Sequence, residues 1–188
     1  MGGSSEQASA TGRVSSRRVY SGKVISVDLD EVRFPDGTTG ELEMIRHSGA
    51  SAVVPLLEKA NTQQVVLVRQ YRYAASGYIY EIPAGRLGPD ETPESCALRE
   101  LKEETGYSAA VLQKLTTIYT TPGFTDERIH IFLAERLTPG DSAHEPDEFL
   151  ELFPVFLSEA VEMVKMGEIV DAKTCVALLL TDLMLASK

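Results

Sequence analysis

Residues 85–107 read GRLGPDETPESCALRELKEETGY, and this stretch decides how the chain is built. The Gly-Pro-Asp sequence at 88–90 is typical of a turn. Thr92 can cap a helix N-terminus, and Pro93 suits the first helical position. Gly106 is placed to end the helix in the left-handed conformation. The stretch therefore predicts a loop, followed by a helix that runs from about Pro93 to the residue before Gly106.

Three glutamates share one face of the predicted helix. Glu100, Glu103 and Glu104 are spaced i, i+3 and i+4, so like charges there repel by about 0.2–0.5 kcal/mol per pair. The last turns of a helix also favour cations over anions. A solvated acidic face would be the ordinary explanation, because runs of charge usually lie at the surface. A bound Mg²⁺ is the alternative, since it takes oxygen ligands and leaves room for substrate phosphates.

The spacing on either side of these glutamates extends the pattern. Gly85 is followed after five residues by Glu91, and after seven more by Arg99, which begins the run RELKEETGY. This arrangement resembles the Nudix box, G-x5-E-x7-R-E-U-x-E-E-x-G-U, where U is a bulky apolar residue. Every fixed position is matched, with Tyr107 in the last U position. The resemblance implies a Nudix hydrolase, a Mg²⁺-dependent enzyme that cuts a nucleoside diphosphate linked to another group.

Length and composition fit one enzyme domain with a small extension. The chain has 188 residues, of which 43% are hydrophobic and 24% charged, as in ordinary globular proteins. Its net charge of −10 argues against a nucleic-acid partner, which would call for a basic face. Small phosphorylated substrates stay compatible with this charge, because metal ions can supply positive charge locally.

The sequence also gives an expectation for the compartment. The N-terminus lacks the apolar core of a signal peptide, and the longest apolar run, 175–180, is too short to span a membrane. Cys96 and Cys175 lack the spacing of a zinc site and are expected to be free thiols in a reducing compartment. We therefore expect a cytoplasmic protein with no membrane partner.

Three segments are predicted along the chain. Residues 1–16 are rich in Gly, Ser and Ala and predict a disordered tail. Residues 17–48 predict a small antiparallel sheet of about three strands, with a turn at 35–37. Such a sheet is thin alone, so a second subunit is the obvious partner. Residues 49–188 contain the box.

This third segment predicts a mixed sheet between helices, an α/β (α+β) fold. The same architecture follows from the resemblance, which implies a Nudix α/β/α sandwich. Strands are expected near 50–57, 64–70, 79–82, 111–119, 128–134 and 150–156, with helices near 93–105, 158–167 and 171–186.

Further stretches resemble the branch of the family that comprises ADP-ribose and nucleoside diphosphate sugar pyrophosphatases. They are RQYR at 69–72, YEIPAG at 80–85, TPGFTDE at 121–127 and GEIVDAKT at 167–174. The resemblance thus covers about residues 17–186. It implies a homodimer whose N-terminal sheets swap across the interface, which would give the thin sheet its partner.

The resemblance also implies the metal ligands. Glu100 and Glu104 would bind Mg²⁺ directly, and Glu103 would bind it directly or through water. The carbonyl of Ala84 would complete the coordination, and Arg99 would orient the glutamates. Mn²⁺ can substitute for Mg²⁺ in such sites.

Two substrate contacts are implied in the same way. Arg72 would contact the diphosphate, and Glu81 would contact the ribose or the metal shell. An arginine at a strand end is also common as a surface ion pair, so both readings of Arg72 stay open.

The general base is expected in the acidic loop 144–151, which reads HEPDEFLE. Glu148 is the first candidate because it directly precedes the apolar strand. Glu145 is the second, and Glu103 follows if neither loop residue serves. A base in this loop would take the proton of the attacking water.

The substrate expected first is ADP-ribose, giving AMP and ribose 5-phosphate. A nucleotide-sugar hydrolase of broad specificity, acting for example on GDP-mannose, would use the same metal site. The chain has no Trp, so the base would stack on a residue such as Tyr20, Phe34 or Tyr71. A non-catalytic nucleotide sensor is a further alternative, but it fits poorly with the presence of all three box glutamates.

Overall fold

The computed structural model describes residues 11–59, 62–141 and 150–187. The chain forms two compact units. Unit 1 comprises Met1–His47 together with Thr121–Glu127, and unit 2 comprises Ser48–Thr120 together with Arg128–Lys188. The boundary along the chain falls between His47 and Ser48, and one segment distant in sequence joins the N-terminal unit.

Unit 1 is a three-stranded antiparallel sheet in the order β1-β2-β3. The strands are β1 (Gly12–Ser21), β2 (Ser26–Arg33) and β3 (Thr39–Arg46). The predicted tail, 1–16, is wrong for its last five residues, because β1 begins at Gly12. Two serine hydroxyls of β1 donate hydrogen bonds to carboxylates of β2. Ser15 Oγ donates to Glu31 over 3.1 Å, and Ser16 Oγ donates to Asp30 over 2.6 Å.

Ion pairs organise the interior of unit 1. Asp28 and Asp30 are buried in the sheet. Arg46 donates to both carboxylates, and Arg18 donates to Asp28. Hydrogen bonds from Arg18 and then Arg46 hold the pKa of Asp28 below its usual value. Ion pairs between β1, β2 and β3 thus compensate the two buried carboxylates of this unit.

The segment Thr121–Glu127 lies along β3. The N–H of Ile45 donates to the carbonyl of Phe124 over 2.7 Å, and the N–H of Asp126 donates back to the carbonyl of Ile45 over 3.3 Å. The Asp126 carboxylate also accepts the N–H of His47 over 2.9 Å. The sequence motif TPGFTDE is thus part of the sheet of unit 1, through a parallel bridge between Ile45 and Thr125.

Unit 2 is built on a seven-stranded mixed sheet with the order β10-β5-β4-β9-β8, to which β6 adds beside β5 and β7 beside β4. The pairing of β4 with β9 is parallel and the other pairings are antiparallel. The strands are β4 (Ala50–Lys59), β5 (Thr62–Arg72), β6 (Gly77–Glu81), β7 (Ala84–Arg86), β8 (Ser108–Tyr119), β9 (Arg128–Thr138) and β10 (Leu150–Phe156), with a 3₁₀ turn at Tyr73–Ala75.

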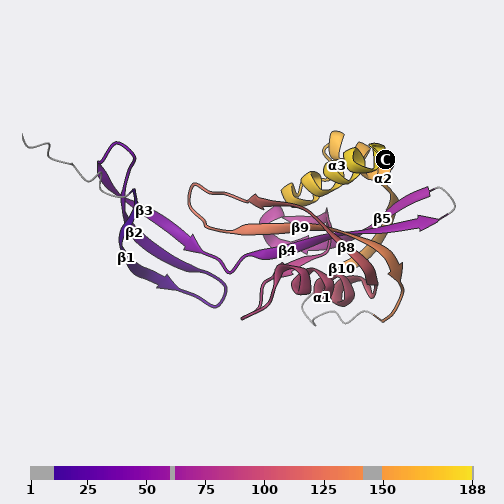
Figure 1. The fold of residues 1–188 in the computed structure, drawn as a ribbon, viewed down its shortest axis with the longest axis horizontal. Helices are drawn as coiled ribbons and strands as arrows, with labels where there is room; N and C mark the ends of the chain where they lie inside the picture. Colours follow the sequence, from indigo (N-terminus) through magenta and orange to yellow (C-terminus); the bar gives the residue numbers. More distant parts are fainter. Residues whose placement is uncertain (1–10, 60–61, 142–149, 188) are drawn as a thin grey trace, which may run out of the picture. The chain divides into compact units, whose positions relative to one another are not determined.

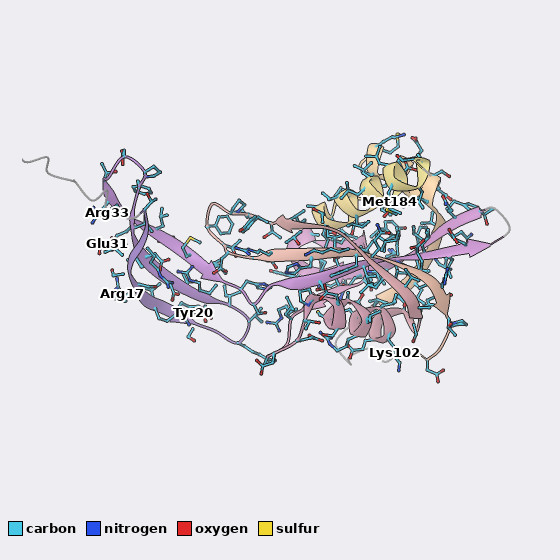
Figure 2. The ribbon with its side chains drawn as sticks, viewed as in Figure 1. Arg17, Tyr20, Glu31, Arg33, Lys102 and Met184 are labelled. Carbon is cyan, nitrogen blue, oxygen red and sulfur yellow. The ribbon has the colours of Figure 1, made fainter. Side chains whose placement is uncertain are left out.

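Helices cover both faces of this sheet (Figure 1). They are α1 (Pro93–Thr105), α2 (Leu157–Lys165) and α3 (Ala172–Ala186). Figure 2 shows Lys102 of α1 and Met184 of α3 on opposite sides of the sheet. The predicted α/β/α sandwich with a mixed sheet is confirmed.

Alternation along the strands explains the two layers. Val53 and Phe132 pack with Ala97 and Leu101 of α1. Their strand neighbours face the other way and join α2 and α3 in a larger core that includes Val54, Leu67, Ile131, Leu133, Ala160 and Leu178. Successive residues of a strand point to opposite faces, so the continuous apolar runs of β4 and β9 serve both cores. None of the helices in the described part of the chain has the length and apolar character needed to cross a lipid bilayer.

Candidate active site

Helix α1 begins and ends where its local sequence predicts. The Thr92 side chain accepts the N–H of Ser95 over 3.2 Å, and Pro93 occupies the first turn. Gly106 ends the helix with φ 75°, a left-handed conformation that glycine adopts without strain. The caps fix both ends of α1, and with them the position of its last two turns, which carry the three glutamates.

These glutamates do not form a solvated face. Glu100 and Glu104 are only 8% and 3% exposed, and Glu103 is half-buried. Burial of carboxylates is costly unless cations or hydrogen bonds compensate it. The ordinary surface explanation therefore does not account for Glu100 and Glu104.

Arg99 joins the box carboxylates through one guanidinium group. Its Nη1 donates to Glu100 over 2.6 Å and to Glu103 over 2.9 Å. Its Nε and Nη2 form a bidentate pair with Glu91 at 2.8 and 3.0 Å. Hydrogen bonds from Arg99, and then from the N–H of Gly88, lower the pKa of Glu91 to about 2. Arg99 thus holds three carboxylates with the planar set of donors that only arginine offers.

The backbone of β7 lies directly against this cluster. A Cβ at Gly85 would stand 1.7 Å from Glu100 Oε1, so only glycine leaves room for the carboxylate. The neighbouring residue Ala84 lies on the same strand, and its backbone carbonyl oxygen is the predicted metal ligand. Carboxylate and carbonyl oxygens are the ligands of hard divalent cations, so the residues present fit such an ion. In the described ranges, no three His, Cys, Asp or Glu side chains converge closely enough to enclose one.

A second charged cluster brings together Arg72 and Glu81. Arg72 Nε and Nη2 donate to the two oxygens of Glu81 over 2.6 and 3.0 Å. Glu81 is 2% exposed, so this is not a surface ion pair. Both oxygens of Glu81 accept hydrogen bonds from Arg72.

Lys173 is the member of this cluster that the sequence did not reveal. Its Nζ donates to Glu81 Oε2, and to Asp171 Oδ2 over 3.0 Å. Burial alone would raise the pKa of Glu81, but the hydrogen bonds from Arg72 and the charge of Lys173 bring it below its ordinary value. One signal was present: a lysine in the first turn of a helix opposes the helix dipole, so it usually has a compensating partner.

The start of α3 is attached to the strand that leads into the site. Asp171 caps the helix by accepting the N–H of Thr174 over 3.0 Å. The buried Thr174 hydroxyl donates to Asp171 over 2.6 Å and accepts the N–H of Ile82 over 2.9 Å. Ile82 lies between Glu81 and the segment that carries Ala84. One buried side chain therefore sets the distance between α3 and this segment.

The two clusters influence each other electrostatically. The pKa of Arg72 lies above its ordinary value, first because Glu81 accepts its hydrogen bonds, with smaller contributions from the charges of Glu104 and Asp171. The charge of the box carboxylate Glu104 thus reaches Arg72, the partner of Glu81.

The remaining predicted residues are placed as follows. Glu145 and Glu148 lie outside the described residues. Tyr20 and Phe34 are exposed on unit 1, and Tyr71 is exposed on unit 2, where its ring packs edge-on against Tyr78 at 5.6 Å. No one of these aromatic side chains is singled out as a base-stacking residue.

Comparisons with known proteins agree with this geometry. A model of the NUDIX domain matches residues 46–174. The ADP-ribose pyrophosphatase of Bacillus subtilis (strain 168) is 41% identical over 167 residues, 88% of this chain and 89% of that protein. A GDP-mannose pyrophosphatase of Shigella flexneri serotype 5b (strain 8401) is 39% identical over 160 residues, 76% of this chain and 82% of that protein.

A solved structure described as an ADP compounds hydrolase has the same fold. It superimposes with a TM-score of 0.80, covers 94% of this chain and 95% of its own, and is 22% identical.

The attachment of α3 to β6 gives a first prediction. Thr174→Val keeps the shape of the side chain but leaves the buried N–H of Ile82 without its acceptor, and it should lower the free energy of unfolding by about 1–3 kcal/mol. Thr181→Val is the matched control, since Thr181 is equally buried and donates only to Ala177 of its own helix. It should cost less than about 1 kcal/mol. Urea denaturation measures both, and equal losses would show that the Ile82 bond has no special weight.

Proposed function

This chain belongs to the NUDIX family of pyrophosphohydrolases, and we propose that it hydrolyses the diphosphate bond of ADP-ribose, releasing AMP and ribose 5-phosphate. The observation that carries the proposal is the burial of Glu100 and Glu104 at the end of α1, within electrostatic range of Arg72. Carboxylates suited to a divalent cation thus lie near an arginine suited to phosphate. The ADP-ribose pyrophosphatase relative, which matches most of the chain, supports ADP-ribose as the first substrate.

Divalent metals generally serve Nudix hydrolases, and we propose Mg²⁺ here, with Mn²⁺ able to substitute. Glu100, Glu104 and the carbonyl of Ala84 would hold it, with Glu103 binding directly or through water. When bound, Mg²⁺ supplies neutralisation of the diphosphate charge and a lowered pKa for the attacking water. The hydrogen bonds from Arg99 to Glu100 and Glu103 support its proposed role, which is to orient these carboxylates.

Arg72 is the proposed diphosphate contact. Its side chain is 43% exposed although its partner Glu81 is buried, so part of the Arg72 side chain is accessible from solvent. A planar guanidinium can bind phosphate oxygens through two parallel hydrogen bonds. Glu81 is proposed to contact the ribose or the metal shell, and its bidentate pair with Arg72 also orients the guanidinium.

Glu148 is the proposed general base, with Glu145 as the second candidate. Strand β10 begins at Leu150, which pairs with Gln70 on β5, two residues before Arg72. The segment that follows Glu148 in sequence is therefore fixed beside the strand that carries the diphosphate contact, which supports Glu148 over Glu145.

There are two alternatives to this function: a different substrate, or binding without catalysis. The GDP-mannose pyrophosphatase relative favours a nucleotide-sugar hydrolase, possible with the same metal and phosphate residues. A non-catalytic nucleotide sensor would need no buried carboxylates at the metal site, and this chain keeps Glu100, Glu103 and Glu104.

A homodimer in the reducing cytoplasm completes the proposal. The free thiols Cys96 and Cys175 support the compartment. Unit 1 supports the dimer because several large apolar side chains between residues 11 and 47 are exposed, and exposed apolar patches mark interaction sites. These exposed residues are Val14, Val19, Tyr20, Val24, Ile25, Phe34 and Leu42 (Tyr20 is labelled in Figure 2).

A substrate panel tests the function. The purified chain with Mg²⁺ should show its highest kcat/KM on ADP-ribose and release AMP and ribose 5-phosphate, identified by chromatography. GDP-mannose, ADP-glucose, dinucleoside polyphosphates, coenzyme A and nucleoside triphosphates complete the panel. A higher kcat/KM on GDP-mannose would select the nucleotide-sugar alternative, and binding without turnover would select the sensor.

Glu104→Gln gives the matching test of the metal assignment. The change removes a ligand charge without changing shape, so kcat on ADP-ribose should fall by at least about 100-fold. Circular dichroism should show an unchanged fold. Glu162→Gln, which alters an exposed carboxylate on α2, is the control and should keep full activity. Near-normal turnover by Glu104→Gln would remove Glu104 from the metal site.

The base assignment has its own test. Glu148→Gln should lower kcat by about 10²–10⁴-fold with little change in KM, because a base acts mainly in the transition state. Glu145→Gln should have a much smaller effect. Steady-state kinetics at saturating Mg²⁺ compare the two variants. A larger fall in Glu145→Gln would reverse the assignment, and no effect in either would make Glu103 the leading candidate.

The dimer is tested by charge substitutions on exposed apolar residues. Val19→Glu alters a half-exposed residue of β1 and should shift the mass measured by light scattering from dimer to monomer. Leu183→Glu alters an exposed residue of α3 and is the control that should stay dimeric. If Leu183→Glu dissociates the protein and Val19→Glu does not, α3 and not unit 1 forms the interface.

A further inference from the structure

Glu81 is shared by two cations that differ in their access to solvent. The Arg72 side chain is 43% exposed, whereas that of Lys173 is 11% exposed and that of Glu81 is 3% exposed. Arg72 therefore lies where a ligand can reach it, and Lys173 lies behind the carboxylate. The two cations approach Glu81 from different elements, β5 and α3.

The bonds to Glu81 overlap at one oxygen. Oε1 accepts from Arg72 Nε alone, while Oε2 accepts from both Arg72 Nη2 and Lys173 Nζ. If Arg72 turned away, Oε2 would keep a cation. Asp171 holds the other side of the Lys173 ammonium at 3.0 Å, so its position does not depend on Arg72.

This arrangement matters because Arg72 has two competing uses. Its Nε and Nη2 edge, the edge that binds a carboxylate bidentately, is occupied by Glu81. A diphosphate bound at this edge would compete for the same donors, whereas the Nη1 group does not donate to Glu81. Removing the only cation from a buried carboxylate is strongly unfavourable, because the charge is left uncompensated. Arg72 can therefore present its Nε and Nη2 edge to a substrate only if another cation compensates Glu81.

We propose that Lys173 is a positioning residue that keeps Glu81 compensated while Arg72 exchanges the carboxylate for the diphosphate of the substrate. The inference rests on the proposed function, because it takes Arg72 as the diphosphate contact. Lys173 acts through Glu81 and does not itself touch substrate. Its placement in the first turn of α3, against the helix dipole, is offset by Asp171 and Glu81 together.

Lys173→Met is the principal test. Without its second cation, Glu81 would retain Arg72, and KM for ADP-ribose should rise about tenfold or more, the effect of one charge-assisted hydrogen bond, while kcat changes less. Lys173→Arg keeps the charge and should restore most of the loss. Lys165→Met is the matched control, since it removes an exposed lysine paired with Glu162 on α2, and it should leave KM unchanged.

A double-mutant cycle separates this role from a merely structural one. Glu81→Gln removes the buried negative charge. Residue 81 then needs no second cation when Arg72 turns to the diphosphate. In that background, Lys173→Met should change KM by less than about twofold, the usual limit of additivity. A general structural defect would instead appear at the same size in both backgrounds. If Lys173→Met does not fold, Lys173→Gln takes its place in the cycle, because its amide can still donate to Glu81 without carrying charge.

The outcomes distinguish this inference from the proposed function. Turnover of ADP-ribose by the unaltered chain, with an unchanged KM in Lys173→Met or an equal effect in the Glu81→Gln background, overturns the role of Lys173 and leaves the function standing. A chain that turns over no diphosphate in the substrate panel overturns both. A raised KM that is absent in the Glu81→Gln background supports the inference.

Discussion

The burial of negative charge is the constraint on which unit 2 depends. Glu81, Glu100 and Glu104 are each at most 8% exposed, and a buried carboxylate is tolerated only where cations and hydrogen bonds compensate it. The compensating groups identified here come from the ends of secondary-structure elements: Arg99 from the later turns of α1, Arg72 from the last residue of β5, and Lys173 from the first turn of α3. The two apolar cores set the positions of these ends, so packing far from the charges fixes the geometry of the site.

Local sequence signals predicted local structure, and long-range pairing decided the rest. Helix α1 was predictable to the residue because Thr92, Pro93 and Gly106 act within one turn of its ends. The start of β1 at Gly12 was not, because the hydroxyls of Ser15 and Ser16 are satisfied by carboxylates on another strand. Lys173 was not predicted as part of the site for the same reason, because its partner Glu81 is 92 residues away in sequence. The motif at 121–127 was visible, but its pairing with β3 depends on the fold.

The candidate site was predictable as far as a linear motif specifies it. The box gave the carboxylates and Arg99 in register, and the structure adds that Gly85 must lack a side chain because Glu100 lies against it. The structure also adds that one oxygen of Glu100 and one of Glu103 accept hydrogen bonds from Arg99. In the proposed metal site, Arg99, itself paired bidentately with Glu91, would orient these carboxylates.

The two charged clusters solve related problems with different cations. Arg99 faces three carboxylates at once, so a planar guanidinium with several donors is required. Lys173 faces two carboxylates in a confined space at a helix start, where a compact ammonium suffices. This difference bears on the exchange proposed for Arg72: the Lys173 ammonium donates to Oε2 of Glu81, which it shares with Arg72, and leaves Oε1 to Arg72. In the role proposed for Lys173, Glu81 keeps Arg72 oriented before substrate arrives and retains a cation when Arg72 turns to the diphosphate.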